Sequence, residues 1–328
     1  MLGSIAIVGA GSIGTSWAIV FARGGHPVAV YDPDPARLAA AGEEIAARLA
    51  ALEAAALLAE SGTEIAARVS THDQLGPALE GAVHIQECAP EQLELKRELF
   101  NELDTLADPD AVIASSSSAL TISETAGHLP GRGRCLVVHP ANPPHLLPVV
   151  ELVPAAFTDP AVTERTFALL KASGMSPVHV RHEIEGFVYN RLQGAVLREA
   201  YCLVRDGVIS VDDIDRVMRE GLGRRWAVIG PFETADLNTR GGIAEHARKM
   251  GPAYARMGAE RGQHDPWDDE LVAAVTEQRR ALLPLSDWER RIDWRDRALI
   301  AQERARRLFD SQAVDHSQPA WQSARAAQ

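Results

Sequence analysis

A glycine-rich turn near the start of the chain constrains the fold more than any other feature. Ser4 to Val8 is a short apolar run, and Gly9-Ala10-Gly11-Ser12-Ile13-Gly14 follows it directly. A helical pattern continues through Arg23, and a second strand-like run, Pro27 to Tyr31, ends at Asp32. Strand, glycine turn, helix, strand and acid, in this order, make up a dinucleotide-binding βαβ unit. The sequence therefore predicts that the fold begins as a Rossmann-type domain.

Each part of this motif has a physical task in binding a cofactor. Glycines permit a tight turn and close approach to a pyrophosphate, which meets the unpaired N–H groups at the start of the helix. Asp32, eighteen residues past Gly14, would accept hydrogen bonds from a ribose diol and repel a 2′-phosphate. We therefore predict NAD rather than NADP; a glycine turn in an unrelated βαβ unit is the alternative. The predicted cofactor-binding residues here are Gly9, Gly11, Ser12, Ile13, Gly14 and Asp32.

Strand and helix patterns alternate through the first 184 residues, which predicts an α/β fold with a mostly parallel sheet. Alanine-rich residues 36–69 indicate a long helix or a helical hairpin broken near Ser61-Gly62. After Gly186 the pattern changes to helices, with Phe187–Arg205 and Asp212–Gly221 as the clearest. Further strands are expected at 83–86, 111–114, 135–138, 149–153 and 178–180. We expect an NAD-binding Rossmann domain over 1–184, an all-helical substrate and dimerisation domain over 185–310, and a loosely ordered tail over 311–328.

Composition limits the partners of the chain. Its 328 residues include 45 acidic and 33 basic side chains, and the net charge of −12 argues against binding nucleic acid or an anionic membrane. No apolar run approaches the length of about 18 residues that a membrane span needs, and no basic leader precedes the first strand, so we expect a cytoplasmic protein. Cys88, Cys135 and Cys202 are widely spaced in apolar segments, which favours buried thiols over a metal site.

Two polar residues near predicted strands form a candidate catalytic pair. His139 directly follows a strand, and Glu151 interrupts the apolar run Val149–Val153 twelve residues later. Because burying a lone carboxylate is costly, Glu151 needs a partner, and His139 is the obvious one. An outward-facing glutamate is the alternative. A nicotinamide carries hydride but removes no hydroxyl proton, whereas a histidine oriented by a carboxylate does so near neutral pH. The pair and the glycine turn together indicate an alcohol dehydrogenase.

Two further positions carry a weaker signal. Ser115–Ser118 follow the strand at 111–114, where a loop or a helix cap explains a serine run as well as a site does. Asn190 lies inside a predicted helix, although asparagine is a poor helix former, so its side chain has a separate task or is simply exposed. From the residues alone, both explanations stay open for each position.

Three stretches are distinctive in combination. They are Val-His-Ile-Gln-Glu-Cys at 83–88, His-Pro-Ala-Asn-Pro-Pro at 139–144, and Gly-Leu-Gly-Arg-Arg-Trp at 221–226 followed by Ile-Gly-Pro at 229–231. With these motifs, the chain from Ile5 to about Ile243 resembles the 3-hydroxyacyl-CoA dehydrogenase superfamily, and within it the branch of λ-crystallin and L-gulonate 3-dehydrogenase. A weaker echo follows at Trp294-Arg295-Asp296.

The resemblance implies a catalytic set. His139 matches the catalytic base of the family, and Glu151 matches the carboxylate paired with it. Ser118 and Asn190 match polar groups that position the substrate, and Ser118 also lies near the cofactor. The resemblance also implies a homodimer formed through the helical domain, in which the helix Phe187–Arg205 is apolar over much of its surface.

The resemblance also implies binding residues. Glu91 and Lys96 match contacts to the nicotinamide ribose side of NAD, and Asn142 matches a further cofactor contact. Arg225 sits where the gulonate branch has an arginine, whose guanidinium suits bidentate binding of a free carboxylate. A solvated loop charge is the alternative for Arg225.

One departure from the family concerns the substrate. Acyl-CoA members carry lysines in the hairpin after the second strand, where they meet the phosphates of CoA; here residues 35–92 contain no lysine, and Arg48 and Arg68 are the remaining candidates. We therefore predict NAD-dependent oxidation of the 3-hydroxyl of a small hydroxy acid, as in L-gulonate 3-dehydrogenase. A 3-hydroxybutyryl-CoA dehydrogenase or a carnitine-like dehydrogenase is the alternative. A non-catalytic crystallin-like protein or a nucleotide sensor is less favoured, because neither needs the polar set.

Overall fold

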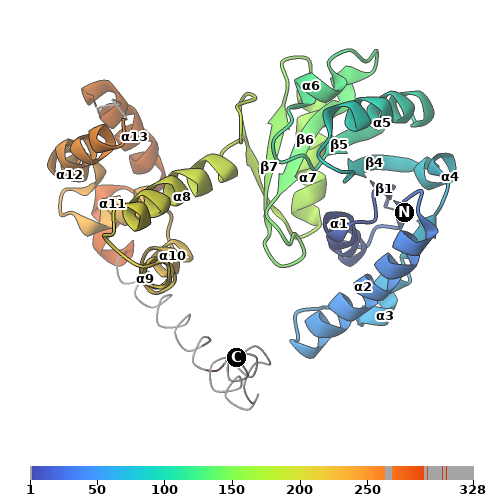
Figure 1. Cartoon of the computed structure of the whole chain (residues 1–328), viewed down its shortest axis with the longest axis horizontal. Helices are drawn as coiled ribbons and strands as arrows, with labels where there is room; N and C mark the ends of the chain where they lie inside the picture. The colour runs from blue at the N-terminus through green and yellow to red at the C-terminus, as the bar shows by residue number, and fades with distance from the viewer. Residues whose placement is uncertain (1, 263–267, 292–293, 295–304, 306–307, 309–328) are drawn as a thin grey trace, which may run out of the picture. The chain divides into compact units, whose positions relative to one another are not determined.

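The computed structural model describes residues 2–262, 268–291, 294, 305 and 308 (Figure 1). Its sheet has eight strands in the order β3-β2-β1-β4-β5-β6-β7-β8, and every neighbouring pair is parallel except β6 and β7. The predicted α/β fold with a mostly parallel sheet is confirmed. The strands are β1 (Ser4–Val8), β2 (Val28–Tyr31), β3 (Val69–His72), β4 (Ala82–Glu87), β5 (Val112–Ser115), β6 (Cys135–Pro140), β7 (Val149–Pro154) and β8 (Ser176–His179).

Helices cover both faces of this sheet because the strand residues alternate between two apolar clusters. In β1, Ile5 and Ile7 pack in one cluster, whereas Ala6 and Val8 pack in the other. The first cluster is covered by α1 (Ser12–Arg23), α2 (Pro35–Ala54), α3 (Gly62–Ala66) and α7 (Pro160–Ala172). The second is covered by α4 (Leu75–Leu79), α5 (Leu93–Leu106) and α6 (Ile122–Ala126), with the 3₁₀ turn η1 (Arg132–Arg134) before β6.

Some predicted boundaries are displaced. The helical hairpin is present, but its turn occupies 55–61, and Ser61 is the N-cap of α3 in a reciprocal capping box with Glu64. The edge strand β3 was not predicted, because its sequence Val-Ser-Thr-His is polar and its residues are half-buried or exposed. The last strand, β8, begins at Ser176 rather than at Val178.

The chain forms two compact units, Met1–Glu199 and Ala200–Gln328, which we call the sheet unit and the helical unit. The division falls within α8 (Tyr189–Arg205), which begins two residues later than predicted, because Phe187 has φ +48° and is not helical. The predicted tail 311–328 lies outside the described residues. The helical unit contains α9 (Val211–Val217), the π turn η2 (Met218–Leu222), α10 (Gly223–Trp226), α11 (Pro231–Asn238), α12 (Gly242–Glu260), α13 (Asp269–Leu282) and the 3₁₀ turn η3 (Leu285–Asp287).

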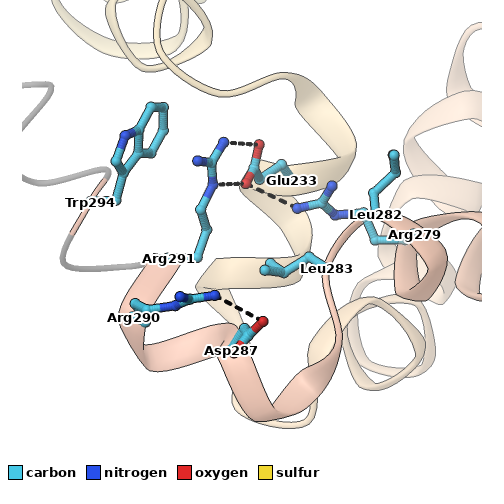
Figure 2. Close-up of a pocket in the computed structure, with 8 residues that line it drawn as sticks. All are labelled: Glu233, Arg279, Leu282, Leu283, Asp287, Arg290, Arg291 and Trp294. Atoms are coloured by element: carbon cyan, nitrogen blue, oxygen red, sulfur yellow. Dashed lines mark hydrogen bonds and ion pairs between the residues drawn. The ribbon is translucent and has the colours of Figure 1, made fainter.

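Charged side chains occupy much of the interior of the helical unit. Glu233 accepts hydrogen bonds from Arg291 and lies 3.0 Å from Nη2 of Arg279, beside a cavity of about 650 Å³ (Figure 2). Asp236 is fully buried; its Oδ1 pairs with Arg280 and accepts the N–H of Ile243 at 2.7 Å. Among the described residues, no helix has the apolar length that crossing a membrane requires.

Candidate active site

The sheet topology gathers the predicted site at one edge. Strands β1, β4, β5 and β6 are parallel neighbours, so the segments that follow them lie at the same edge of the sheet. Strand β7 runs antiparallel to β6, and its register places Glu151 directly opposite His139. The carboxylate Oε2 of Glu151 lies 2.8 Å from Nδ1 of His139, and the two residues are only 3% and 6% exposed. The antiparallel pairing therefore joins two residues that are twelve positions apart.

The second oxygen of Glu151 reaches the start of α8. Its Oε1 accepts the backbone N–H groups of Val188 at 2.8 Å and Tyr189 at 3.0 Å. Burial by itself raises the pKa of Glu151, but the hydrogen bonds from His139, Tyr189 and Val188 outweigh burial and hold that pKa below its usual range. An ionised Glu151 accepts a hydrogen bond from Nδ1–H of His139, which keeps the proton on Nδ1 and leaves Nε2 of that ring as the proton acceptor.

The structure also brings Asn190 and Ser118 together. The side-chain Nδ2 of Asn190, in the first turn of α8, donates to the backbone carbonyl of Ser118 at 2.9 Å. Asn190 directly follows Tyr189, whose N–H binds Glu151, so the four predicted catalytic residues form one connected group. The rings of Phe187 and Tyr189 lie 5.5 and 6.3 Å from the ring of His139, centroid to centroid.

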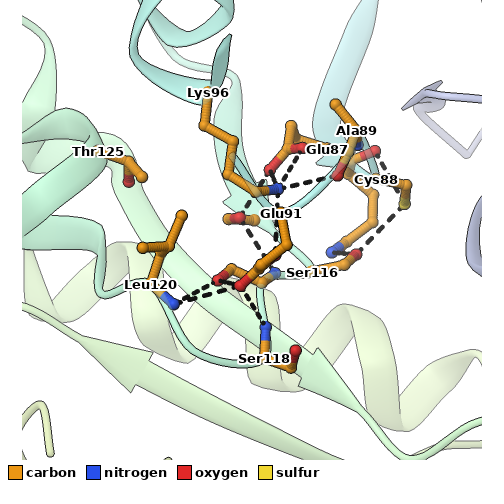
Figure 3. A network of polar contacts seen from close by, with 12 residues as sticks. Glu87, Cys88, Ala89, Glu91, Lys96, Ser116, Ser118, Leu120 and Thr125 are labelled. Carbon is orange, nitrogen blue, oxygen red and sulfur yellow. Dashed lines mark hydrogen bonds and ion pairs between the residues drawn. The ribbon is translucent and has the colours of Figure 1, made fainter. Parts of the chain in front are cut away.

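The predicted cofactor contacts Glu91 and Lys96 belong to a polar network beside this group (Figure 3). Lys96 is 1% exposed, and its Nζ donates to both carboxylate oxygens of Glu87, at 2.7 and 3.0 Å, and to the carbonyl of Ala89 at 3.1 Å. Glu91 accepts hydrogen bonds from the turn that includes Ser118. Both residues therefore have protein partners, and their predicted contact with NAD stays a prediction.

The glycine turn has the geometry that a dinucleotide requires. Gly9 has φ +107°, and a Cβ on Gly14 would lie 1.9 Å from the carbonyl oxygen of Gly9, so both positions require glycine. A Cβ on Gly11 would meet nothing within 4 Å, which leaves open space beside the start of α1. Asp32 is half-buried, and its two oxygens accept the N–H groups of Ala10 at 2.9 Å and Asp34 at 3.0 Å. These residues fit NAD.

The remaining predicted residues are Asn142, in the sheet unit, and Arg225, in the helical unit. Asn142 is exposed in the segment that follows β6. Arg225, in α10 of the helical unit, lines a cavity of about 480 Å³ whose walls include Trp226, Phe232 and His246. No aspartate or glutamate lines that cavity among the described residues, so its electrostatic character is set by Arg225.

The two arginines that remained as candidates for binding CoA phosphates are engaged with protein groups. The guanidinium of Arg48 donates to the hydroxyls of Thr15 at 2.7 Å and Ser16 at 2.9 Å. Arg68 pairs with Glu60 and donates to the carbonyl of Ala22 at 3.0 Å. Neither side chain extends freely from the hairpin.

The three cysteines are free, but only Cys135 is buried as predicted; Cys88 and Cys202 are half-buried. Burial raises the pKa of both Cys88 and Cys135 to about 12, which disfavours the reactive thiolate at these two positions. In the part of the chain that the structure describes, no three His, Cys, Asp or Glu side chains are grouped so that they could hold a metal ion.

Sequence reasoning missed several residues that build the site. Glu87 is fully buried at the end of β4, and Ser117 is 1% exposed in the turn after β5. Phe187 and Tyr189 place backbone and rings beside the His139–Glu151 pair. The only signal for Glu87 was a charged residue at the end of an apolar run, and the backbone N–H donors of α8 have no signature in the side chains.

Comparisons with known proteins agree with these features. Residues 4–184 match the sequence profile of the 3-hydroxyacyl-CoA dehydrogenase NAD binding domain, and residues 186–281 match that of the 3-hydroxyacyl-CoA dehydrogenase C-terminal domain. Lambda-crystallin of Oryctolagus cuniculus is 40% identical over 315 residues, which cover 94% of this chain and 98% of that protein.

Two further similarities are informative. An L-carnitine dehydrogenase/betainyl-CoA thioesterase of Ruegeria pomeroyi is 35% identical over 274 residues, which cover 83% of this chain and 56% of that protein. The solved structure of a 5-formyl-3-hydroxy-2-methylpyridine 4-carboxylic acid 5-dehydrogenase, an NAD⁺-dependent dismutase, matches with a TM-score of 0.71 at 28% identity and covers 88% of this chain and 98% of that one.

Proposed function

Because the chain belongs to the 3-hydroxyacyl-CoA dehydrogenase family, in its λ-crystallin branch, we propose that it oxidises the 3-hydroxyl of a small free hydroxy acid. It is an NAD-dependent hydroxy acid dehydrogenase by family. The observation that carries the proposal is the contact of 2.8 Å between His139 and the buried Glu151, with Asn190 and Ser118 in the same connected group. The free acid is gulonate-like.

In this mechanism His139 is the base. Its Nε2 accepts the hydroxyl proton, while Glu151 holds the proton on Nδ1 and stabilises the imidazolium that forms. The glycine turn and Asp32 would hold NAD, which would supply the acceptor for the hydride. The hydroxyl of Ser118 and the second N–H of the Asn190 amide donate hydrogen bonds to the reacting oxygen, where negative charge develops.

The charges of the chain support a free acid over a CoA thioester. The hairpin of α2 and α3 has no lysine, and its Arg48 and Arg68 are held by neighbouring protein groups. The arginines of this hairpin, Arg37, Arg48 and Arg68, each pair with a glutamate, so the phosphates of a CoA tail would have to compete with those carboxylates. Arg225, in a cavity without acidic residues among those described, is suited to a single carboxylate.

A panel of substrates tests the proposal. We expect the highest kcat/KM with gulonate or 3-hydroxybutyrate when these are compared with carnitine and 3-hydroxybutyryl-CoA, each with NAD and with NADP. The family profile favours 3-hydroxybutyryl-CoA as a second candidate, and the Ruegeria pomeroyi relative favours carnitine as another. A clear preference for the thioester would contradict the inference, drawn from the hairpin of α2 and α3, that the substrate is a free acid. Tight NAD binding without turnover of any member would favour a crystallin-like role.

Helix α8 supports a homodimer. It buries no residue completely within the single chain, and Leu197, Tyr201 and Val204, which lie on one face of the helix at positions i, i+4 and i+7, are 45%, 75% and 38% exposed. An apolar helix face of this kind is stabilised by a second copy, which would cover it. We expect light scattering at micromolar concentration to give twice the mass of the chain; the mass of one chain would contradict the dimer.

A further inference from the structure

A single carboxylate oxygen of Glu91 gathers four donors from one turn. Its Oε1 accepts the hydroxyl of Ser117 and the backbone N–H groups of Ser118 at 3.2 Å, Ala119 at 3.0 Å and Leu120 at 3.3 Å (Figure 3). We call residues 117–120 the serine turn. The N–H groups of Leu120 and Ala119 also donate to the Ser117 hydroxyl, at 2.8 and 3.4 Å. Glu91 and Ser117 therefore hold the path of the chain after β5 together, and Glu91 is the acceptor that connects this turn to the segment before α5.

Glu91 lies beside a buried ion pair, formed by Glu87 and Lys96. Its Oε2 lies 3.7 Å from Nζ of Lys96, whose three N–H donors are all used by Glu87 and Ala89. Glu87 also accepts the hydroxyl of Ser115 at 2.6 Å, and both members of the Glu87–Lys96 pair are at most 1% exposed. Burial raises the pKa of Glu91, but the Ser117 hydroxyl, the Lys96 charge and the N–H groups of the serine turn together lower it below the usual range.

The serine turn carries two members of the candidate site. Ser118 presents its own hydroxyl, and its carbonyl accepts Nδ2 of Asn190 at 2.9 Å. From Lys96 through Glu91 to Ser118 and Asn190, each step is a direct contact. A shift of the serine turn would therefore move both polar groups together.

We propose that Glu91 is a positioning residue: by fixing the serine turn, it places the Ser118 hydroxyl and the Asn190 amide against the oxygen that reacts. The assignment of Ser118 and Asn190 to that oxygen rests on the proposed function. A residue that only contacted the cofactor would need none of the four hydrogen bonds on Oε1. The proposal therefore assigns the main effect of Glu91 to kcat rather than to the affinity for NAD.

Three variants separate these two roles. Glu91→Ala removes all four hydrogen bonds, and Glu91→Gln keeps an acceptor oxygen without the charge. Ser117→Ala removes one donor to Glu91 and also the acceptor that the N–H groups of Leu120 and Ala119 use inside the turn. We expect kcat to fall at least about tenfold in Glu91→Ala and less in the other two, because small misplacements of positioned groups are costly. The Kd for NADH, from fluorescence titration, should change by a smaller factor than kcat, even if Glu91 also contacts the cofactor.

Hydrogen exchange supplies a readout that needs no substrate. We expect faster exchange at the amides of Ser118, Ala119 and Leu120 in Glu91→Ala, and a smaller acceleration in Glu91→Gln. Glu94→Gln is the matched control, because Glu94 lies three residues later, in the first turn of α5, and pairs only with Arg97 among the contacts described. This control should change neither kcat nor the exchange of the serine turn.

Two outcomes would overturn the proposal. One is weaker NADH binding at unchanged kcat, which would make Glu91 a cofactor contact. The other is unchanged exchange in the serine turn in Glu91→Ala. If Glu91→Ala does not fold, Glu91→Gln decides by the same measurements. Because kcat is measured with whichever acid or thioester the wild type oxidises, failure of the free-acid proposal leaves this test intact.

Discussion

In the sheet unit, Glu151 and Glu91 receive backbone N–H groups from the segments that carry Asn190 and Ser118, whereas in the helical unit Glu233 and Asp236 are surrounded mainly by guanidinium groups. The first arrangement connects a charge to a backbone that has to be placed accurately. The second connects side chains of different helices to one another. It leaves some atoms without a hydrogen bond, among them Oδ2 of Asp236 and Nε of Arg279. We infer that buried carboxylates organise a site in one unit and hold helices together in the other.

The largest effect should follow from removing the base in the sheet unit. We expect His139→Gln to lower kcat by roughly a hundredfold to ten-thousandfold, because general-base catalysis contributes about that much. The Kd for NADH, measured by fluorescence titration, should stay near that of the wild type. The control is His128→Gln, since His128 is a partly exposed residue bonded to Asn101. A kcat near the wild-type value in His139→Gln would reject the assignment of the base.

In the helical unit, we expect the loss of a buried carboxylate to lower stability rather than kcat. Asp236→Asn leaves Arg280 facing a neutral amide in a fully buried place, so we expect the free energy of unfolding to fall by about 3–5 kcal/mol. At a temperature where the variant is folded, kcat should be close to that of the wild type. The control is Asp287→Asn, which breaks an exposed pair with Arg290 and should cost less than about 1 kcal/mol. A variant of full stability with low kcat would contradict the comparison.

A buried histidine gives the sheet unit a pH dependence of its own. Burial lowers the pKa of His84 to about 4, and its Nε2 lies 3.0 Å from Oε1 of Gln86. Below pH 6.5 the unfolded chain binds a proton at this residue that the folded chain does not bind, so stability is lost as the pH falls from about 6.5 to 4. We expect a loss on the order of 3 kcal/mol. Denaturant unfolding across this range checks the inference. The free energy of unfolding of the wild type should fall more steeply with falling pH than that of His84→Gln, and equal slopes for the two proteins would contradict it.

The smallest effect is expected at Arg225. This is the charged residue of the helical unit that we assign to substrate binding rather than to holding helices together. We expect Arg225→Met to raise KM for the free acid by roughly ten- to a hundredfold, with a smaller change in kcat, since a charge-assisted pair is lost. The neighbouring Arg224, which pairs with Glu220, supplies the control Arg224→Met. An equal rise in KM for both variants would assign the effect to the local structure of α10.

Features of the fold and of the candidate site that depend on particular side chains could mostly be predicted from the sequence. The glycine turn marks β1, α1 and β2, since two positions there require glycine. A carboxylate in the apolar strand β7 indicated a partner, and His139 lies opposite it. Contacts made by backbone groups were not predictable, because the N–H groups of Val188 and Tyr189 are independent of their side chains. Edge strand β3 was missed because a half-exposed strand at the edge of a sheet needs no apolar alternation.

The antiparallel pairing of β6 and β7 has a consequence for the loop that joins them. Residues 139 and 151 face each other through the ladder of the sheet, so their spacing does not depend on the loop between the two strands. A change of length at residues 146–148, beyond Asn142 and His145, would therefore leave the distance between His139 and Glu151 unchanged. The ladder fixes that distance, whereas the loop carries the predicted cofactor contact Asn142, so the two tasks are assigned to separate parts of one hairpin.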